Sequence, residues 1–527
     1  MTTTREAALH GLLDAAVAGR VSSWSPPPGD AEWARGLELW ASVLTQRWRA
    51  PLPPPPAGDP EAGWLQYAAA LWSASGDPGR DSGALLARLG ESALPDPGTP
   101  LGRFAGYLLV EATMAHARLD LAASIADRLG PRVWASVGHP FGAAVAVCRA
   151  RLLAFRGDIA AAGAVVAGIP PPTEPLLAAL VAATSALVRG NDADATEVRR
   201  LVATVDAIGA PEGHLAVGAH LLAAYGEVAL QDTSAAARRV LLAGGDEQLS
   251  RLNVVDRALA LEALVSFAVA HGDLDAAETW ADQIAPLLAS PIADSTAARA
   301  LSRVALLAGR ADEAVAWGER ALARAGEVDR VIEHAEAEIV LNRARLEHPG
   351  HSSADAVRAL RAMVAAAEER GHGMARRAAA RELRAAGLRL PPLAGSGWAG
   401  LSEREADVAR LVAAGLSNHA VAQALHVSDH TVRAHLSRVL AAFGVATRSA
   451  LPAAVRAGPP GPARLARDRL TSRQRDVAAL VADGLRNAEI AARLALSERT
   501  VERHVSDVLG RAGLPNRVAL ARAWLAG

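Results

Sequence analysis

The sequence predicts an all-α protein, in which a solenoid of helical hairpins is followed by two copies of a small four-helix domain. The chain of 527 residues is 51% hydrophobic and only 4% aromatic, and its abundance of Ala and Leu favours helices. A turn-like phrase recurs along the middle of the chain. A C-terminal stretch occurs twice without a gap at an offset of 69 residues, so that Ser428 corresponds to Ser497.

Residues 1–95 are predicted to form an N-terminal helical region, in which proline clusters at 26–28 and 53–56 separate short helices. Trp33, Trp40 and Trp48 recur at about two helical turns, so we expect them to form one apolar stripe in the core. An aromatic box that binds a ligand is the alternative interpretation.

Residues 96–388 are predicted to form the solenoid, because Ala-rich amphipathic helices alternate there with a recurring turn. In this turn a small residue closes one helix, an Asp or Asn caps the next, and Ala residues allow close helix contact. The turns are marked by Ala117, Gly157, Gly190, Gln231, Gly272 and Gly309. The clearest copy, residues 272–277 (GDLDAA), resembles the turn of the tetratricopeptide family. This resemblance implies a concave groove that holds a peptide, protein or small-molecule effector, whereas a scaffold without such a partner is the alternative.

The C-terminal part is predicted to contain a linker at residues 389–400, a first domain at 401–455, a second linker at 456–469 and a second domain at 470–527. Pro391 and Pro392 end the preceding helix, and glycines follow them. In each domain a capping box opens the first helix, Ser402 with Glu405 and Thr471 with Gln474.

The next two helices of each domain are predicted from their caps and apolar faces. Asn418 and Asn487 are expected to cap the second helix, and Ser428 and Ser497 the third. The third helix should bury one face and expose the other. The predicted buried residues are Val432, Leu436 and Val439 in the first domain and Val501, Val505 and Val508 in the second.

The second and third helices of each domain are joined by a tight turn, and the third has a polar outer face. This pattern predicts that the third helix enters the major groove of DNA. Arg on that face can bind guanine O6 and N7, and capped helix N-termini can approach phosphates. Two helical bundles without a nucleic-acid role are the alternative.

Both copies resemble the LuxR-type helix-turn-helix family, at Leu401-Ser402, Gly415-Leu416, Val427-Ser428, Thr431-Val432, His435 and Gly444 and at their counterparts 69 residues later. The resemblance implies a bacterial transcription regulator that binds double-stranded DNA, with RNA polymerase as a further candidate partner. The implied base-reading residues are Arg433, Ala434, Ser437, Glu502, Arg503 and Ser506. The candidate DNA-backbone contacts are Asn418, Ser428, Thr431, Arg438, Asn487, Ser497, Arg499, Thr500 and Arg511.

Composition narrows the function further. Residues 401–527 carry 18 Arg against 11 Asp and Glu in a chain whose net charge is −1, which favours a polyanionic partner for this part. The chain has no Lys, so a Walker A loop and a Schiff-base lysine are excluded. GxSxG, HExxH and dinucleotide motifs are also missing. We therefore expect neither an enzyme nor a cofactor, and we interpret His426 and His430 as solvated residues without a metal.

Two expectations remain. The single Cys148, the lack of a signal-like N-terminus and the lack of an uncharged apolar run of about 18 residues predict a soluble cytoplasmic protein without membrane contact. The alternative function is a solenoid adaptor whose C-terminal helices bind a protein.

Overall fold

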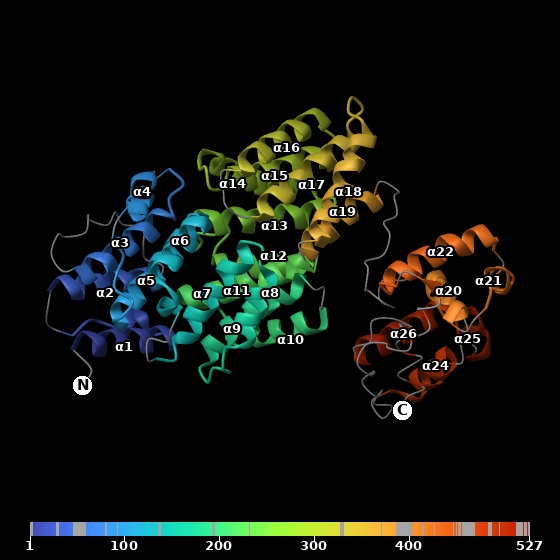
Figure 1. Ribbon diagram of the computed structural model, residues 1–527, viewed down its shortest axis with the longest axis horizontal. Helices are drawn as coiled ribbons and strands as arrows, with labels where there is room; N and C mark the ends of the chain where they lie inside the picture. Colours follow the sequence, from blue (N-terminus) through green and yellow to red (C-terminus); the bar gives the residue numbers. More distant parts are fainter. Residues whose placement is uncertain are drawn as a thin grey trace. The chain divides into compact units, whose positions relative to one another are not determined.

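The computed structural model of the chain divides into two compact units, Met1–Leu388 and Arg389–Gly527, whose helices are labelled in Figure 1. The structure describes residues 4–27, 31–45, 60–79, 82–91, 93–134, 139–191, 195–230, 232–326, 331–369, 372–385, 403–413, 416–425, 427–445, 447–448, 451, 455, 470–482, 487–494, 496–512, 520 and 524. Regular structure among these residues is helical throughout, so the all-α prediction is confirmed.

The first half of the N-terminal unit forms ten helices within the described residues. They are α1 (Thr4–Val17), α2 (Ala31–Leu44), α3 (Pro60–Ala74), α4 (Gly83–Glu91), α5 (Pro100–Ala115), α6 (Leu119–Leu129), α7 (Gly142–Phe155), α8 (Ile159–Ala167), α9 (Pro175–Asn191) and α10 (Ala195–Asp206). Short 3-10 turns lie at Val21–Ser23 and Pro131–Trp134. A continuous apolar cluster runs through all of these helices except α8 and continues into residues 215–223.

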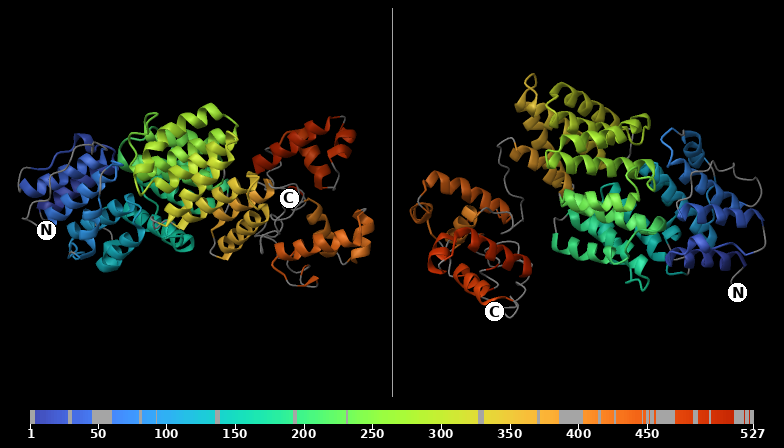
Figure 2. Two further views of the ribbon diagram at one scale, coloured as in Figure 1. Left: turned by 90° about the horizontal axis from the view of Figure 1, so that it is seen from above. Right: turned by 180° about the vertical axis from the view of Figure 1, so that it is seen from behind.

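The second half of this unit continues the pattern of antiparallel helices. They are α11 (Gly213–Ala229), α12 (Thr233–Gly244), α13 (Val254–Ala270), α14 (Leu274–Ile284), α15 (Asp294–Leu307), α16 (Ala311–Ala325), α17 (Val331–Glu347), α18 (Ser353–Glu369) and α19 (Gly373–Ala385), with a 3-10 turn at Ala285–Ala289. Consecutive helices from α13 to α17 lie side by side in all views (Figures 1 and 2).

The predicted side-chain cap is found at three of the six marked turns. Asp158, Asp232 and Asp273 each accept a hydrogen bond from the backbone N–H three residues later, at 2.9, 3.0 and 3.0 Å. These bonds satisfy N–H groups that the first helical turn leaves open. At the corresponding position of α16, Arg310 makes no such side-chain cap.

The residue before the cap adopts a left-handed conformation in these turns. Gly157, Gly272 and Gly309 have φ of 94°, 67° and 74°, and Ala117 has φ of 54°. A left-handed residue ends a helix without leaving its last carbonyls unpaired. The prediction is wrong for Gly190, which lies inside the last turn of α9 and does not follow it. Ala229 and Gly226 of α11 approach Gly190 too closely for a side chain, which explains the glycine at this position. Gln231 lies outside the described residues.

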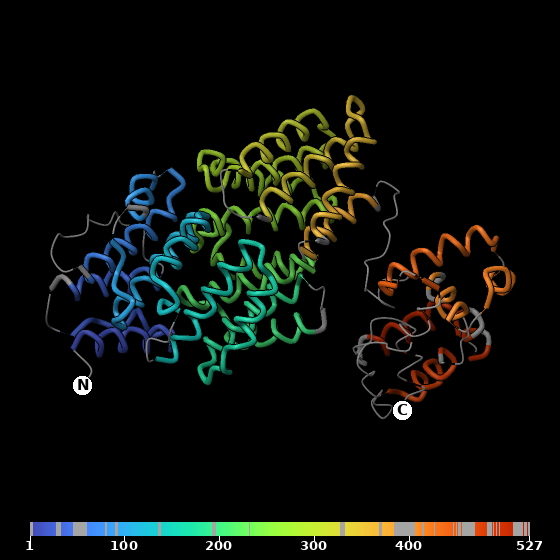
Figure 3. Tube along the Cα trace, viewed as in Figure 1, coloured from blue at the N-terminus to red at the C-terminus, as the bar shows by residue number. Residues whose placement is uncertain are grey.

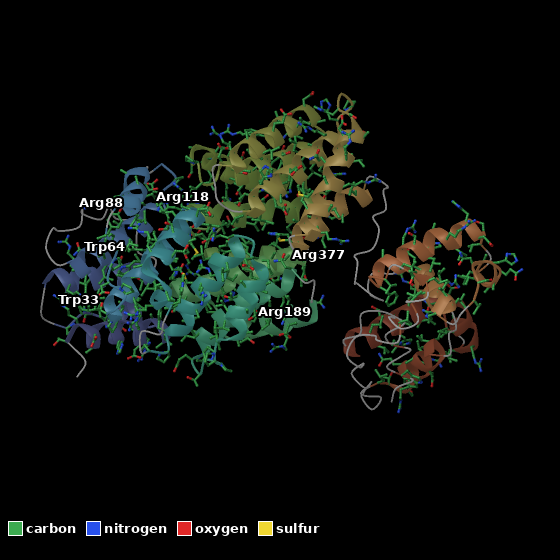
Figure 4. All side chains as sticks on the ribbon, viewed as in Figure 1. Trp33, Trp64, Arg88, Arg118, Arg189 and Arg377 are labelled. Atoms are coloured by element: carbon green, nitrogen blue, oxygen red, sulfur yellow. The ribbon has the colours of Figure 1, made fainter. Side chains whose placement is uncertain are left out.

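The N-terminal tryptophans belong to the core, as the spacing predicts. Trp33 and Trp40 are 4% and 2% exposed on α2, and the indole N–H of Trp40 donates to the carbonyl of Leu65 at 2.9 Å. Figure 4 shows Trp33 on this helix. Trp48 lies outside the described residues. Burial of such side chains supplies much of the packing energy of a small helical layer.

The last described helix of this unit, α19, returns to a segment that precedes it by more than 180 residues. Arg377 donates from Nη1 to the carbonyl of Asn191 at 2.8 Å and from Nη2 to those of Gly190 and Ala229 at 2.5 and 2.8 Å. Because the last carbonyls of a helix have no partner within it, one guanidinium joins the ends of α9 and α11 to α19. Figure 3 traces the backbone of these helices, and Figure 4 labels Arg377.

The C-terminal unit contains two sets of three described helices. They are α20 (Glu403–Ala413), α21 (Asn418–Leu425) and α22 (Asp429–Ala442), and then α24 (Ser472–Ala482), α25 (Asn487–Leu494) and α26 (Glu498–Ala512). Each set has its own apolar core. Most residues of the expected fourth helices lie outside the described residues, although Leu451 and its counterpart Leu520 are fully buried.

Among the described residues, no helix combines the length and the apolar character needed to cross a membrane.

Candidate nucleic-acid interface

The third helix of each set is fixed at its start by a hydroxyl cap. Ser428 Oγ accepts from the N–H of Thr431 at 3.1 Å, and Ser497 Oγ accepts from that of Thr500 at 3.1 Å. The two hydroxyls of each pair also hydrogen-bond, at 2.9 and 2.7 Å. Both predicted caps are therefore confirmed, and they determine where α22 and α26 begin.

One face of each third helix is buried, as the sequence predicts. Val432, Leu436 and Val439 are 0%, 8% and 0% exposed, and Val501, Val505 and Val508 have the same values. They pack on apolar residues of the two preceding helices, including Val421 and Ile490. This packing fixes the rotation of α22 and α26 about their axes, so the opposite face must lie toward solvent.

That opposite face carries every candidate base-reading residue. The exposed residues are Arg433, Ala434 and Ser437 on α22, and Glu502, Arg503 and Ser506 on α26. The charged side chains of Arg433, Glu502 and Arg503 make no hydrogen bond or ion pair with another described residue. Both faces can therefore offer donors or acceptors to base edges without breaking an internal contact.

The candidate contact Arg438 has a different environment from Arg433. Its Nη1 donates to Glu405 Oε1 at 3.0 Å, and His435 Nδ1 lies 3.7 Å from the same oxygen. Glu405 is buried. From the sequence, Glu405 was expected only at the start of the first helix, and this bond between α20 and α22 was not predicted.

The second set replaces both members of that pair. Gln474 stands at the position of Glu405, and Asp507 at that of Arg438. Gln474 instead completes the predicted capping box. Its side-chain Oε1 accepts from the backbone N–H of Thr471, and its backbone N–H donates to Thr471 Oγ1, both at 3.2 Å. The paired change at a constant offset is the sequence signal that could have revealed the contact.

The predicted cap at Asn418 is wrong by one residue. Helix α21 begins at Asn418, and the hydroxyl before it, Ser417 Oγ, accepts from the N–H of Ala420 at 3.2 Å. Asn418 Oδ1 accepts from Arg448 Nη1 at 2.6 Å, so it ties the residues after α22 to the start of α21. Helix α25 likewise begins at Asn487 itself.

The remaining candidate contacts are placed as follows. Thr431, Thr500 and Arg499 lie in the first turns of α22 and α26, and Arg499 is exposed. Helix N-termini with free N–H groups attract phosphate oxygens. The side chain of Arg511 and all of His426 lie outside the described residues, and His430 is exposed.

Each set contains three helices, the last two of which are joined by a tight turn. The third helix is capped at its start, buries one face and exposes a polar face. This arrangement defines each set as a helix-turn-helix domain. Residues 399–454 and 468–524 both match the family described as bacterial regulatory proteins, luxR family. The two C-terminal segments are therefore LuxR-family domains, and the resemblance read from the sequence is confirmed for them. The family match does not extend to the N-terminal unit.

Similar curated proteins also carry the helix-turn-helix description, over a shorter stretch of this chain. A segment of 52 residues is 50% identical to a protein of Mycobacterium bovis and to one of Mycobacterium tuberculosis (strain CDC 1551), both named as HTH-type transcriptional regulators. A third, from strain H37Rv of M. tuberculosis, is 51% identical over 51 residues. The matches cover 10% of this chain and 6% of the length of each relative.

Proposed function

We propose that the protein is a DNA-binding transcription regulator, whose two helix-turn-helix domains read paired sites in the major groove. The observation that carries this proposal is the duplicated geometry of α22 and α26, in which a capped helix buries an apolar stripe and presents an exposed polar face. In this proposal the six candidate base-reading residues contact base edges, and the residues at the helix starts contact phosphates.

The presence of two domains in one chain supports binding to paired sites. A single domain of this size offers few phosphate contacts, so such domains normally act in pairs on two half-sites. Here residues 456–469, which include four arginines, would hold the second domain near the first and raise its effective concentration. Ala441 stands where the family usually carries a basic residue, so both domains should be needed for tight binding.

The N-terminal unit is proposed to be the sensor or docking module of the regulator. Its helical hairpins support a solenoid, and α19 precedes residues 389–400, which we propose as a linker to the domains at 401–455 and 470–527. Within this scheme an effector or partner protein binds the solenoid, and RNA polymerase is the candidate target of the bound regulator.

Binding of the full-length protein to genomic DNA fragments tests the central proposal. Sequencing of captured fragments should give a recurring site with two halves, and affinity should fall steeply with salt as counterions are released. Residues 389–527 alone should bind the same fragments. Weak binding without salt dependence or sequence preference would contradict the proposal and favour a solenoid adaptor that binds a protein through its C-terminal helices.

A further inference from the structure

A cavity of about 70 Å³ lies inside the N-terminal unit, where its first and second halves meet. Its walls come from α3, α5, α6, α7, α9 and α11 and from the start of α13. Apolar lining residues include Trp72, Met114, Val147, Leu180 and Leu222. Because one water needs about 10–15 Å³ of such space, the cavity has room for a molecule of about five or six non-hydrogen atoms.

A glycine in the interior of α11 leaves part of this space open. Gly218 lines the cavity, and a Cβ atom added at this position would meet no described atom within 4 Å. Glycine in the interior of a helix lowers its stability relative to alanine. Gly190 and Gly226 are explained by the close approach of a neighbouring helix, but no such contact explains Gly218. Its effect on the structure is to keep room in the cavity, which points to an occupant.

Three donor groups of the lining make no hydrogen bond with another described residue. They are the Tyr107 hydroxyl, the His214 imidazole and Arg151 Nη2, whereas Arg151 Nη1 donates to both oxygens of Glu111, at 3.0 and 3.1 Å. Burial raises the pKa of the Tyr107 hydroxyl and lowers that of the His214 imidazole. At neutral pH the phenol therefore keeps its proton and the imidazole is uncharged. The charge of Arg151 acts on both groups, so the three donors lie near one another. Buried donors without partners favour a ligand that brings oxygen acceptors.

Asp256, in the first turn of α13, offers the opposite chemistry. Its two oxygens accept from neutral donors, the Tyr225 hydroxyl at 3.0 Å and the Asn253 side-chain amide at 2.8 Å. Asp256 forms no ion pair with any residue that the structure describes. A carboxylate bound only by neutral donors keeps its charge and has further lone pairs, so it can accept from an ammonium group.

The formal charges of the lining cancel. The charged residues among the described lining are two carboxylates and two guanidinium groups, Glu111, Asp256, Arg151 and Arg251. A ligand with a net charge would disturb this balance inside the unit, whereas a ligand that carries both charges preserves it. The lining therefore favours a molecule that has an anionic end and a cationic end.

We propose that this cavity binds a small α-amino acid as the zwitterion, whose carboxylate accepts from Tyr107, His214 and Arg151 and whose ammonium group donates to Asp256. A simple carboxylate would leave Asp256 without a cation, and a simple amine would leave the three donors without an acceptor. The regulatory meaning of this site rests on the proposed sensor role of the N-terminal unit, whereas the binding itself does not.

The position of the site joins the two halves of the N-terminal unit. The three donors lie on α5, α7 and α11, and the acceptor Asp256 lies on α13. A ligand that bonds to all four groups stabilises the packing of the second half on the first. Bound amino acid should therefore slow amide hydrogen exchange in Val254–Ala270.

Calorimetric titration of the full-length protein at pH 7 with L-alanine, propionate, ethylamine and propionamide tests the proposal. These molecules are similar in size, but only L-alanine carries both a carboxylate and an ammonium group. We expect saturable binding of L-alanine that is at least about tenfold tighter than that of each of the other three.

Two variants test the position of the site. Gly218→Leu should abolish binding of L-alanine because its side chain fills the cavity, and it should fold because its Cβ meets no described atom and leucine favours a helix. Tyr107→Phe removes one donor and keeps the ring, so it should weaken L-alanine by about fivefold or more. The matched control is Tyr67→Phe, which removes a hydroxyl that donates to the carbonyl of Leu85 and does not line the cavity.

The control Tyr67→Phe should bind L-alanine like the unaltered protein, and circular dichroism should show that all three variants are folded. The proposal is wrong if L-alanine does not bind saturably, if any of the three analogues binds as tightly, or if folded Gly218→Leu binds it equally well. Unchanged hydrogen exchange in α13 at saturating L-alanine would also contradict the proposal. The assay contains no DNA, so its outcome is separate from that of the DNA-binding experiment.

Discussion

Arg438 and Glu405 join the first and third helices of the first helix-turn-helix domain, through a hydrogen bond of 3.0 Å from Nη1 to Oε1. The side chain of Glu405 is 10% exposed and that of Arg438 is 33% exposed. This pair limits the freedom of Arg438 to reach a phosphate, while Arg433 on the same helix has no such partner. The second domain, with Gln474 and Asp507 at these positions, cannot form the same pair.

Removal of this pair should destabilise the first domain. Glu405→Gln leaves Arg438 beside a neutral amide, and we expect the free energy of unfolding of the C-terminal unit to fall by about 1–2 kcal/mol. Thermal unfolding of residues 389–527 measures the change. As a matched comparison, Gln474→Glu combined with Asp507→Arg places the pair in the second domain and should not destabilise it. Equal stability of Glu405→Gln and the unaltered unit would contradict a stabilising role for the pair.

The charge network at Glu262 should make the N-terminal unit sensitive to acid. Burial opposes ionisation of Glu262, but the guanidinium groups of Arg299 and Arg303 outweigh this effect and lower its pKa from 4.5 to about 2. The unfolded chain therefore binds the proton more readily, so the contribution of Glu262 to stability is present above pH 4.5 and is lost as the pH falls toward 2.

The variant Glu262→Gln tests this pH dependence. It leaves Arg299 without its bidentate partner, and we expect a loss of about 3–5 kcal/mol at neutral pH. Its stability should vary less between pH 4.5 and pH 2 than that of the unaltered protein. Circular dichroism during urea unfolding at several pH values measures both effects. Parallel pH curves for the two proteins would show that another carboxylate controls acid unfolding. Glu336 has the opposite sign, since its raised pKa lowers stability as the pH rises above 4.5.

The sequence predicted those parts of the fold that depend on local chemistry. Capping residues such as Asp273 and Ser428 and the buried stripe at Val432 were predicted because each depends on neighbours within one or two helical turns. The exposed position of Arg433 followed from the same stripe.

Contacts between distant segments could not be predicted in this way. The hydrogen bond from Arg377 to the carbonyl of Asn191 joins residues that are 186 positions apart. No local sequence pattern indicates which distant carbonyls an arginine side chain binds. Gly190 was misplaced for a similar reason, because close approach of α11 explains that glycine better than a turn does. Ser417 and Asn418 are both good capping residues, and only the backbone shows which of them precedes the helix.

Arg433 is expected to be the main base-reading residue of the first domain. Because its guanidinium is exposed and has no partner among the described residues, Arg433→Ala should leave stability unchanged. It should cost about 1–3 kcal/mol at the preferred site and relax base choice at one position. Footprinting and fluorescence anisotropy measure both. The control Arg410→Ala removes an exposed arginine of α20 that pairs with Asp407 at 2.7 Å, and it should leave base preference intact. An unchanged footprint for Arg433→Ala would place base reading on other residues.

The two domains are expected to contribute unequally to DNA binding, because Glu502 occupies the position of Arg433 in the second domain. Glu502 is exposed on the same helix face as Arg503 and Ser506. A carboxylate on that face is repelled by phosphates and is best accommodated by a cytosine N4 amino group. Glu502→Arg should therefore tighten non-specific binding and steepen the salt dependence of affinity by about one unit of log–log slope.

A control with the same change of charge separates this local effect from net charge. Glu319→Arg alters an exposed carboxylate of α16 in the N-terminal unit, whose side chain is 53% exposed. If Glu502 faces DNA, Glu502→Arg should change both the slope and the base preference, whereas Glu319→Arg should change neither. If the two variants have the same salt slope and the same base preference, Glu502 does not face the groove. A residue that contacts DNA must change these quantities more than an equal change of charge elsewhere. The second domain would then not require a half-site different from that of the first.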